Sequence, residues 1–177
     1  MKKPPRPDKN SVALAGEFAV LSQLAIHNFN PSLTLGHTKG VDILVSHPES
    51  RKMRRIEVKT SYSTRKKSEK TSKIFGRYHA QWMMQEKSED SADPDLFYCF
   101  VRYVANDQKY EFFVVPNKVV AKYLEAEHGL WRRSHKKGSK KAQKNKIRIF
   151  RIGLDHVEYL IDTPKKKTFE NNWNLLR

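Results

Sequence analysis

The chain has 177 residues, of which 38% are hydrophobic and 11% aromatic, and this composition suits one domain with its own core. Its 35 Lys and Arg residues exceed the 19 Asp and Glu residues by 16, and such a surplus favours a polyanionic partner, usually nucleic acid. The single cysteine, Cys99, excludes an internal disulfide and a cysteine-based zinc site, and no apolar run is long enough for a membrane span. We therefore expect a soluble, cytoplasmic protein with no membrane partner.

The N-terminal part of the chain predicts a tail and a helix. Residues 1–10 are basic, contain prolines and hold few apolar groups, so we expect a flexible tail ahead of a single domain over residues 11–177. A helix is predicted from residue 11 to about residue 29, with Asn10 or Ser11 as its cap. An Asn-Pro pair then stops it.

The middle of the chain predicts strands on both sides of a second helix. A strand-like stretch over 32–36 precedes two apolar runs that flank a polar connector within 41–60, and these runs predict a hairpin. Residues 77–88 place Tyr, Trp and Met at helical spacing, which predicts a helix with these side chains in the core. Two apolar runs within 95–116 surround a polar turn and predict another pair of strands.

The C-terminal part predicts one helix, a basic loop and a last strand. Asn117 can cap a helix that Gly129 ends. The basic loop, over about residues 132–148, contains many Lys and Arg and no acid, and a strand over 146–154 follows. The order of elements indicates an α/β or α+β fold with a central mixed sheet flanked by helices.

Three charged residues stand in the most strand-like segments of the N-terminal half, where charges are unusual. Asp42 is near the start of the first hairpin strand, and Glu57 and Lys59 share one face of the second. The hairpin can bring the two carboxylates together, and a divalent cation such as Mg²⁺ would remove their repulsion, because it prefers oxygen ligands. The alternative is an exposed hairpin edge that carries a solvated salt bridge.

Glu17 adds a carboxylate from the first helix. Its neighbours on the surface of that helix are all apolar: Ala13, Leu14, Val20, Leu21 and Leu24. We therefore expect Glu17 in the middle of the helix face that covers the core, where a carboxylate needs a cation or a basic partner. A structural ion pair with a buried Arg or Lys is the alternative.

These motifs resemble those of the PD-(D/E)XK nuclease superfamily, which includes many restriction endonucleases and the archaeal Holliday-junction resolvases. The resemblance is carried by Gly-Glu at 16–17, Gly-Val-Asp at 40–42 and Ile-Glu-Val-Lys-Thr at 56–60, and in motif it covers about residues 11–61. The later strands and the C-terminal segment are similar to small prokaryotic proteins of the restriction-endonuclease-like group. Val41 replaces the leading proline of the motif, and the glutamine-tyrosine motif of the exonuclease branch has no match.

The resemblance implies a restriction-endonuclease-like core and magnesium-dependent cleavage of DNA. Asp42 and Glu57 match the two acidic metal ligands, and Lys59 matches the catalytic lysine. The backbone carbonyl of Val58 joins the implied ligand set, and Glu17 matches a helix glutamate that holds the metal through water. The implied cofactor is Mg²⁺, for which Mn²⁺ can substitute.

Basic segments on either side of the candidate site are expected to contact phosphates of bound DNA. Residues 62–73 follow the site strand directly, and the loop over 132–148 is expected to become ordered on nucleic acid. The candidate contact residues are His37, Lys39, Ser61, Arg65, Lys66, Lys67, Lys136, Lys137, Lys140 and Lys141.

Two functions from different classes fit these features. The first is a metal-dependent endonuclease that acts on double-stranded DNA, with a homodimer as one expected assembly. The second is a catalytically silent nucleic-acid-binding module of the same fold, and an RNA-directed version of either is an open alternative because phosphate contacts do not distinguish the two polymers. The complete set of Glu17, Asp42, Glu57 and Lys59 favours the enzyme, since a silent module has no physical reason to keep carboxylates where phosphates must approach.

Overall fold

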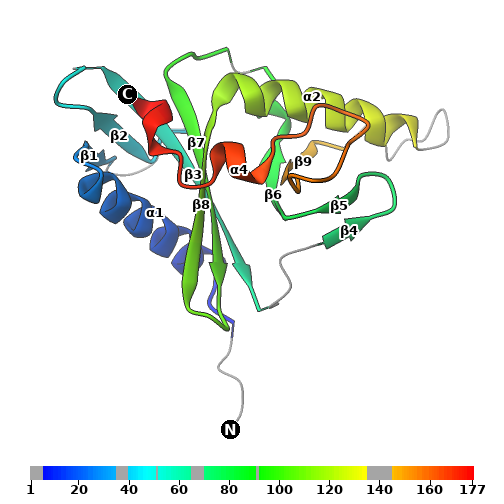
Figure 1. Cartoon of the computed structure of the whole chain (residues 1–177), viewed down its shortest axis with the longest axis horizontal. Helices are drawn as coiled ribbons and strands as arrows, with labels where there is room; N and C mark the ends of the chain where they lie inside the picture. The colour runs from blue at the N-terminus through cyan, green and yellow to red at the C-terminus, as the bar shows by residue number, and fades with distance from the viewer. Residues whose placement is uncertain (1–5, 35–39, 51, 65–69, 91, 135–144) are drawn as a thin grey trace, which may run out of the picture.

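A five-stranded sheet forms the centre of the molecule (Figure 1). Its strands are, in spatial order, β1 (Asn30–Leu33), β2 (Ile43–Ser46), β3 (Met53–Ser63), β7 (Leu96–Val104) and β8 (Lys109–Pro116). β3 and β7 run parallel, whereas the other neighbouring pairs are antiparallel, so the sheet is mixed, as predicted. This computed structural model describes residues 6–34, 40–50, 52–64, 70–90, 92–134 and 145–177.

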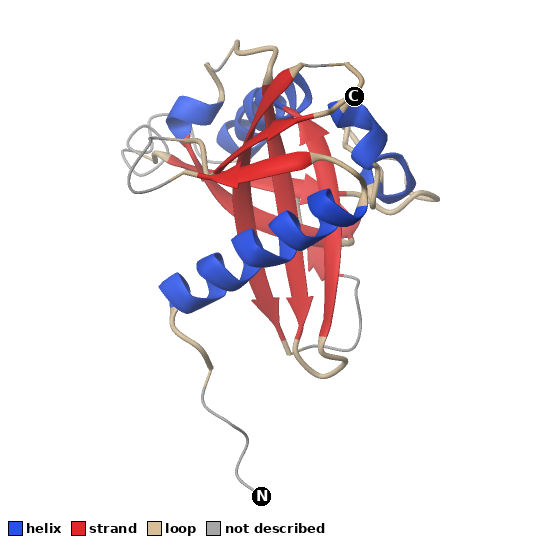
Figure 2. Cartoon of the chain, turned by 90° about the vertical axis from the view of Figure 1, so that its left-hand side faces the viewer, coloured by secondary structure: helices blue, strands red, loops and turns tan. Residues whose placement is uncertain are grey.

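Helix α1 (Lys9–Ile26) covers one face of this sheet and crosses its strands obliquely (Figure 2). Asp8 caps it in place of the predicted Asn10 or Ser11, because the Asp8 carboxylate accepts hydrogen bonds from their amides at 2.9 and 3.0 Å. The helix ends at Ile26 rather than at about residue 29, and the chain turns away through Asn28, whose φ is 62°. The predicted helix is therefore confirmed with shifted ends.

The first hydrophobic core lies between α1 and the sheet. Val20 and Leu24 of α1 form one cluster with apolar side chains of β2, β3, β7 and β8. The C-terminal 3₁₀ helix η2 (Trp173–Leu176) adds Trp173 and Leu176 to it. Cys99 is buried here as a free thiol and burial raises its pKa, so it packs as a small hydrophobic residue.

The opposite face of the sheet is covered by a two-stranded ribbon and by helix α2 (Asn117–Arg133) (Figure 1). The ribbon pairs β6 (Ala80–Gln85) with β9 (Ile147–Ile152) in antiparallel register. Aromatic side chains join the layers: the Trp82 ring lies 5.0 Å from that of Phe100, and the Phe150 ring lies 4.1 Å from the same ring. This second core explains why so many residues of β7 are buried on both faces.

The prediction of a helix over residues 77–88 is wrong. This segment contains the end of β5 (Gly76–Tyr78), all of β6 and the short 3₁₀ helix η1 (Glu86–Ser88), and β5 pairs with β4 (Lys70–Ser72). Along β6, buried side chains alternate with more exposed ones. The period of two reflects pairing with β9, whose residues lie far along the chain, and this tertiary contact overrides the helical propensity of the segment.

Helix α2 continues through Gly129 to Arg133, so the prediction that Gly129 ends it is wrong. Asn117 is the first helical residue rather than the cap, and its side-chain amide donates to the carbonyl of Asp93 at 3.2 Å. The chain closes with the short helix α4 (Lys166–Phe169) ahead of η2. Among the described residues, no helix combines the length and apolar character that crossing a membrane requires.

Candidate active site

Asp42 lies just ahead of β2, and hydrogen bonds hold its main chain on both sides. Its amide donates to the carbonyl of Ile56 at 2.9 Å, and its carbonyl accepts the amide and hydroxyl of Thr34 at 2.9 and 3.1 Å. The Asp42 carboxylate extends past the last paired residues of β2 and β3 and accepts a hydrogen bond from the Val58 amide at 2.7 Å. Because the N–H and C=O of one residue point to the same edge of a strand, the Val58 carbonyl faces this edge too.

Glu57 stands in the middle of β3 and is only 7% exposed. Its Oε1 lies 2.5 Å from the Nζ of Lys59, two residues along the same face of the strand. Tyr98 is its direct neighbour on β7, and the Tyr98 hydroxyl lies near the Glu57 carboxylate. Burial and the charge of Glu57 raise the pKa of Tyr98 to about 12, so the phenol stays a donor. This pair is therefore not the solvated salt bridge of an exposed hairpin edge.

Gly40 brings the chain ahead of Asp42 against Glu57. Its φ of +78° lies in the left-handed region that favours glycine, and a Cβ added there would stand 3.4 Å from the Oε2 of Glu57. The glycine of the Gly-Val-Asp motif is therefore favoured by its backbone conformation and by its close approach to Glu57.

Electrostatic coupling links Asp42, Glu57, Lys59 and Glu17. Burial raises the pKa of Asp42, and the charge of Glu57 adds to the rise, while the Val58 amide and the Lys59 ammonium oppose it. Burial likewise raises the pKa of Glu17, the charge of Asp42 acts in the same direction, and Lys59 acts against it. The site therefore holds more negative charge than Lys59 alone neutralises, which is the situation that a bound cation relieves.

Glu17 reaches this group from the edge of the buried face of α1, not from its middle. The prediction of a central position is wrong, because Ala13 and Leu14, expected to cover the core beside Glu17, are exposed. The centre of the buried face is occupied instead by Gly16, Val20 and Leu24. Glu17 is consequently half-buried and borders the site.

Gly16 sets the distance between α1 and β3. A Cβ added to Gly16 would lie 1.8 Å from the Oγ1 of Thr60, closer than any real contact. The absence of a side chain therefore lets the helix rest directly on the strand that carries Glu57 and Lys59. The same contact places Glu17, the next residue, beside the site.

The donor set suits a hard divalent cation that keeps several waters. Among the residues that the structure describes, no three or more His, Cys, Asp or Glu side chains converge closely enough to hold a metal ion by themselves. The carboxylates of Asp42 and Glu57 and the carbonyl of Val58 supply oxygen donors only, which fits Mg²⁺ better than Zn²⁺.

An open cleft of about 660 Å³ gives solvent access to Glu57 and Lys59. Glu57 and Lys59 line one side of it, and β6, η1 and the start of β9 line the other. The second side carries two exposed lysines, Lys87 and Lys146, and two exposed apolar side chains, Met83 and Ile147.

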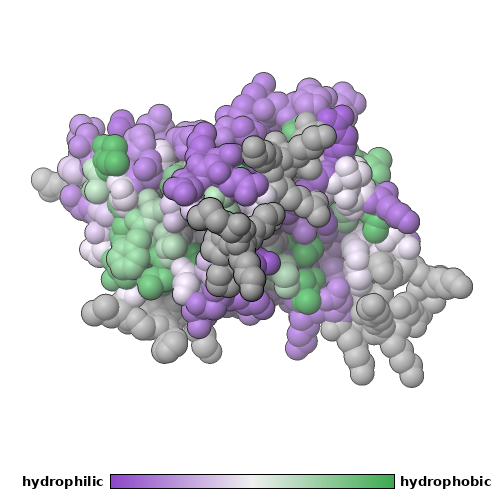
Figure 3. Space-filling view, turned by 90° about the horizontal axis from the view of Figure 1, so that it is seen from below, coloured by the Kyte–Doolittle hydropathy of each residue, from purple (hydrophilic) through white to green (hydrophobic). Residues whose placement is uncertain are grey.

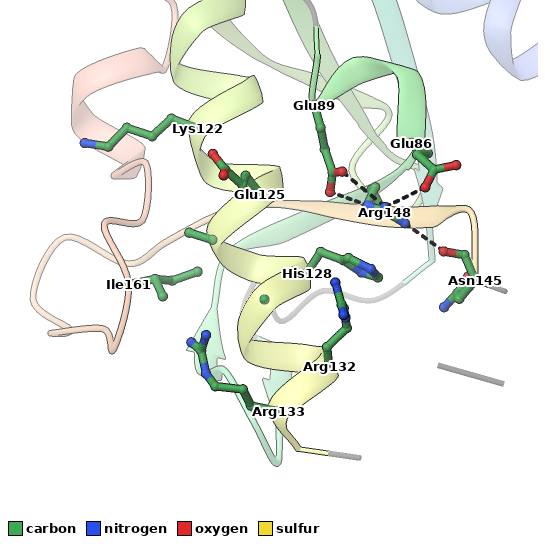
Figure 4. Close-up of a pocket in the computed structure, with 12 residues that line it drawn as sticks. Glu86, Glu89, Lys122, Glu125, His128, Arg132, Arg133, Asn145, Arg148 and Ile161 are labelled. Atoms are coloured by element: carbon green, nitrogen blue, oxygen red, sulfur yellow. Dashed lines mark hydrogen bonds and ion pairs between the residues drawn. The ribbon is translucent and has the colours of Figure 1, made fainter. Parts of the chain in front are cut away.

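A larger hollow of about 850 Å³ adjoins the cleft and shares Glu86 with it. Figure 4 shows Arg148 at its inner wall, where Glu86 and Glu89 both bond the guanidinium. Because carboxylates already neutralise this buried arginine, it ties η1 to β9 rather than offering its charge to a ligand. Arg132 and Arg133, in the last turn of α2, are exposed along the same hollow.

Of the predicted nucleic-acid contacts, only Ser61 lies within the described ranges. It is half-buried on β3, on the same face as Glu57 and Lys59, and its hydroxyl donates to the Val101 carbonyl at 3.4 Å. The other candidates lie outside the described residues: His37, Lys39, Arg65, Lys66, Lys67, Lys136, Lys137, Lys140 and Lys141.

Sequence reasoning missed Tyr98, Thr34 and the role of Gly16. The position of Tyr98 depends on the parallel pairing of β3 with β7, for which the sequence carries no local signal. Gly16 did have a signal, since a glycine inside an otherwise apolar helix weakens the helix and usually has a packing reason.

The comparisons with known proteins show a likeness of fold and none of sequence. No family model matches the chain, and no curated protein matches its sequence. The structure is similar to that of a bacterial homing endonuclease, I-Ssp6803I, with a TM-score of 0.51 over 97% of this chain and 92% of that chain. At 12% sequence identity the likeness concerns the fold alone. The predicted class, a mixed α+β fold with a central mixed sheet flanked by helices, is confirmed.

Proposed function

We propose that the chain is a metal-dependent endonuclease of the PD-(D/E)XK type that hydrolyses phosphodiester bonds of DNA. The observation that carries the proposal is the convergence of Asp42, Glu57 and Lys59 where β3 extends beyond the end of β2. The likeness of the fold to a homing endonuclease supports the same class of function.

The proposed cofactor is Mg²⁺, with Mn²⁺ as a substitute, held by the carboxylates of Asp42 and Glu57 and by the Val58 carbonyl. When bound, the cation would polarise the scissile phosphate and stabilise negative charge that develops on it. The chain prepares this site by fixing one oxygen of Asp42 with the Val58 amide and by holding one oxygen of Glu57 against the Lys59 ammonium. Such prior ordering lowers the reorganisation needed during the reaction.

Lys59 and Glu17 are proposed to act on the water and the phosphate rather than on the binding of DNA. The Lys59 side chain is 34% exposed and borders the cleft, so its ammonium can reach an attacking water or a phosphate oxygen. Glu17 is half-buried at the border of the site, where a carboxylate can accept a hydrogen bond from a water molecule.

Double-stranded DNA is the proposed substrate. The net charge of +16 attracts polyphosphates, and exposed Lys87 and Lys146 stand on the side of the cleft opposite Glu57. Arg132 and Arg133 extend the positive surface into the adjoining hollow. The candidate contacts in the basic loop over 132–148 belong to the same proposal.

Cleavage of supercoiled plasmid tests the function directly. Wild type should give nicked and linear products with Mg²⁺ or Mn²⁺ and none with EDTA, whereas Asp42→Asn should give none with any of these. Lys118→Ala, an exposed position in a separate hollow beside α4, serves as the control and should cleave as wild type does. If the wild type binds DNA or RNA but cleaves neither with any divalent cation, the chain is a silent binding module.

A further inference from the structure

Helix α1 carries an apolar ridge on its outer surface, away from the sheet. Leu14, Phe18 and Ile26 are 49%, 56% and 69% exposed, and Ser22 completes the series at a spacing of four residues. Side chains four residues apart align along a helix, so these four form one continuous row. Figure 3 shows an apolar patch on the side of the molecule where Figure 1 places α1.

Beyond its first turn, the only charged residue of α1 is Glu17, which is half-buried at the border of the candidate site. From Ser11 onward, each exposed residue of α1 is Ser, Ala, Leu, Phe or Ile. A helix on the surface of a soluble protein normally places charged residues on its solvent side, and one that is apolar all round is normally buried. The chain's own sheet buries one face of α1, so we expect another polypeptide to cover the second face.

By composition, the segments outside the described ranges are poorly suited to provide this cover. These segments read MKKPP, LGHTK, RKKSE and HKKGSKKAQK, and the two isolated positions are Arg51 and Ser91. Their Lys, Arg, Gly and Ser residues have too little apolar surface to bury a row of Leu, Phe and Ile.

We propose that α1 mediates a two-fold homodimer, in which the outer ridge packs against the same ridge of a second copy. Two copies that each carry a net charge of +16 repel one another over most of their surfaces, and the uncharged ridge is where they can approach. A two-fold interface uses the same patch on both copies, which a patch without charge permits because no like charges face each other.

The shape of the ridge suits packing against itself. Ala15 and Ala19 lie along one flank, and Ala25 lies along the other together with Leu21 and the half-buried Glu17. Large ridge residues of one copy can enter the shallow grooves beside the alanines of its partner. Ser22, between Phe18 and Ile26, is small enough for the two backbones to approach where the helices cross. Rows of residues four apart favour a crossing angle of about −50°.

The proposed interface is small, so the dimer should dissociate readily. Eighteen residues give α1 a length of about 27 Å, and a face about 10 Å wide is well below the roughly 800 Å² per partner of a standard stable interface. Binding of two copies to one duplex would raise their effective concentration. Glu17 lies on the same helix, so the dimer would fix two candidate sites relative to each other. If the proposed nuclease function holds, each site would face one strand of the DNA duplex.

Sedimentation of the full chain, without DNA or divalent metal, measures the assembly. The mass should rise from 20.8 kDa towards twice that value between about 1 and 100 µM protein. Phe18→Lys places two like charges at the contact and should weaken the dimer at least about 30-fold, as loss of a central aromatic anchor does. Leu160→Lys, at a side chain 83% exposed in the loop between β9 and α4, should leave the mass unchanged.

A disulfide trap gives a second readout that needs no loss of stability. Ser22→Cys should form a covalent dimer on mild oxidation, because Cys99 is buried and gives little background. A wild type that stays monomeric at 100 µM, with no covalent dimer from Ser22→Cys, would overturn the proposal in favour of a different partner protein. A dimer that Phe18→Lys leaves intact would exclude α1 as its interface. Neither measurement depends on nuclease activity, so the proposed dimer and the proposed nuclease function can be contradicted independently of each other.

Discussion

One oxygen of each site carboxylate is engaged by the chain itself. The Val58 amide bonds the Oδ2 of Asp42, and Lys59 lies against the Oε1 of Glu57. These contacts hold the two carboxylates in place, while burial raises the pKa of Asp42 and the charge of Glu57 adds to that rise. Substitutions at these positions should therefore separate three properties: stability, metal binding and chemistry.

Lys59→Ala should separate chemistry from binding. Cleavage in Mg²⁺ should fall at least about a hundredfold, as expected for the loss of one preorganised charge, while duplex binding in Ca²⁺ persists. Glu17→Gln should give a milder loss, and Lys87→Ala, which lines the same cleft on its opposite side, should leave the single-turnover rate nearly unchanged. Single-turnover cleavage and fluorescence anisotropy on one duplex check this. Equal rates for wild type and Lys59→Ala would place the activity elsewhere.

Asp42→Asn should raise the melting temperature of the metal-free protein. It should also remove the rise in melting temperature that added metal gives the wild type. Burial raises the pKa of Asp42 above its unfolded value, so the folded state retains a proton to higher pH and the free energy of unfolding falls as pH rises through the folded pKa. Asparagine keeps an acceptor for the Val58 amide without the charge. In EDTA at pH 7 its melting temperature should exceed that of the wild type, and the difference should vanish below the unfolded pKa.

Added Mg²⁺ or Mn²⁺ should reverse that order of stability. A cation that binds only the folded state raises the melting temperature by mass action, and Asp42→Asn lacks the charge that attracts it. Thermal unfolding over a metal titration provides the measurement. An equal rise in both proteins would remove the proposed site.

The alternation of side chains along a strand was enough to predict that Glu57 and Lys59 share a face, but not where Glu17 lies. The helical pattern around Glu17 is apolar on every side, since α1 has an apolar outer ridge as well as a buried face. Counting apolar neighbours cannot tell the two faces apart. The contact of Gly16 with Thr60 decides between them, and it exists only in the folded chain.

At the level of elements, α1, the β2–β3 hairpin, the β7–β8 hairpin and α2 were predictable because their patterns are local. Each combines an apolar period with a cap or turn within the same stretch of sequence. β6 was not predictable in this way: its Ala, Met and Gln residues favour a helix in isolation. It becomes a strand because β9 pairs with it and the main sheet buries Trp82.

Two Gly→Ala substitutions should have opposite effects on stability. In α2, Gly129→Ala meets only the flexible end of Arg133 at 3.4 Å, so the helix should gain about 0.5–1 kcal/mol. In α1, Gly16→Ala drives its Cβ into Thr60, and the overlap should cost about 1–3 kcal/mol and displace Glu17. Chemical denaturation measures both.

A double-mutant cycle shows whether contact with Thr60 causes the loss of stability in Gly16→Ala. Thr60→Ala removes the atom 1.8 Å from the added Cβ but leaves the Thr60 Cβ at 2.9 Å, so it should restore only part of the stability lost in Gly16→Ala. Strict additivity of the two changes would mean that the helix and strand do not meet at this point.

On the scale of the whole molecule, several glutamates form ion pairs with buried basic side chains of the same chain. Glu127 forms an ion pair with Arg151 at 2.6 Å, and both side chains are buried. Glu86 and Glu89 both form ion pairs with the buried Arg148. Burial alone would raise the pKa of Glu111, but hydrogen bonds from His79 and Arg102 lower it to about 2. With these carboxylates neutralised inside the fold, the lysines dominate the surface that solvent and DNA meet. That surplus was readable from composition, whereas the positions of Lys59, Lys87 and Lys146 around the cleft were not.

Salt dependence should reveal whether DNA lies along that cleft. Each phosphate neutralised by a lysine releases condensed counterions, so the logarithm of the affinity falls linearly with the logarithm of salt concentration. Replacing Lys87 and Lys146 together by Ala should reduce this slope by about 2, one unit for each lost contact, and replacing Lys136, Lys137, Lys140 and Lys141 should reduce it further. Lys109→Ala with Lys118→Ala removes the same charge from positions that do not line the cleft. Anisotropy titrations in Ca²⁺ from about 50 to 200 mM salt measure all three. If both lysine pairs reduce the slope equally, net charge rather than the cleft governs binding, and the duplex path past Glu57 and Lys59 is wrong.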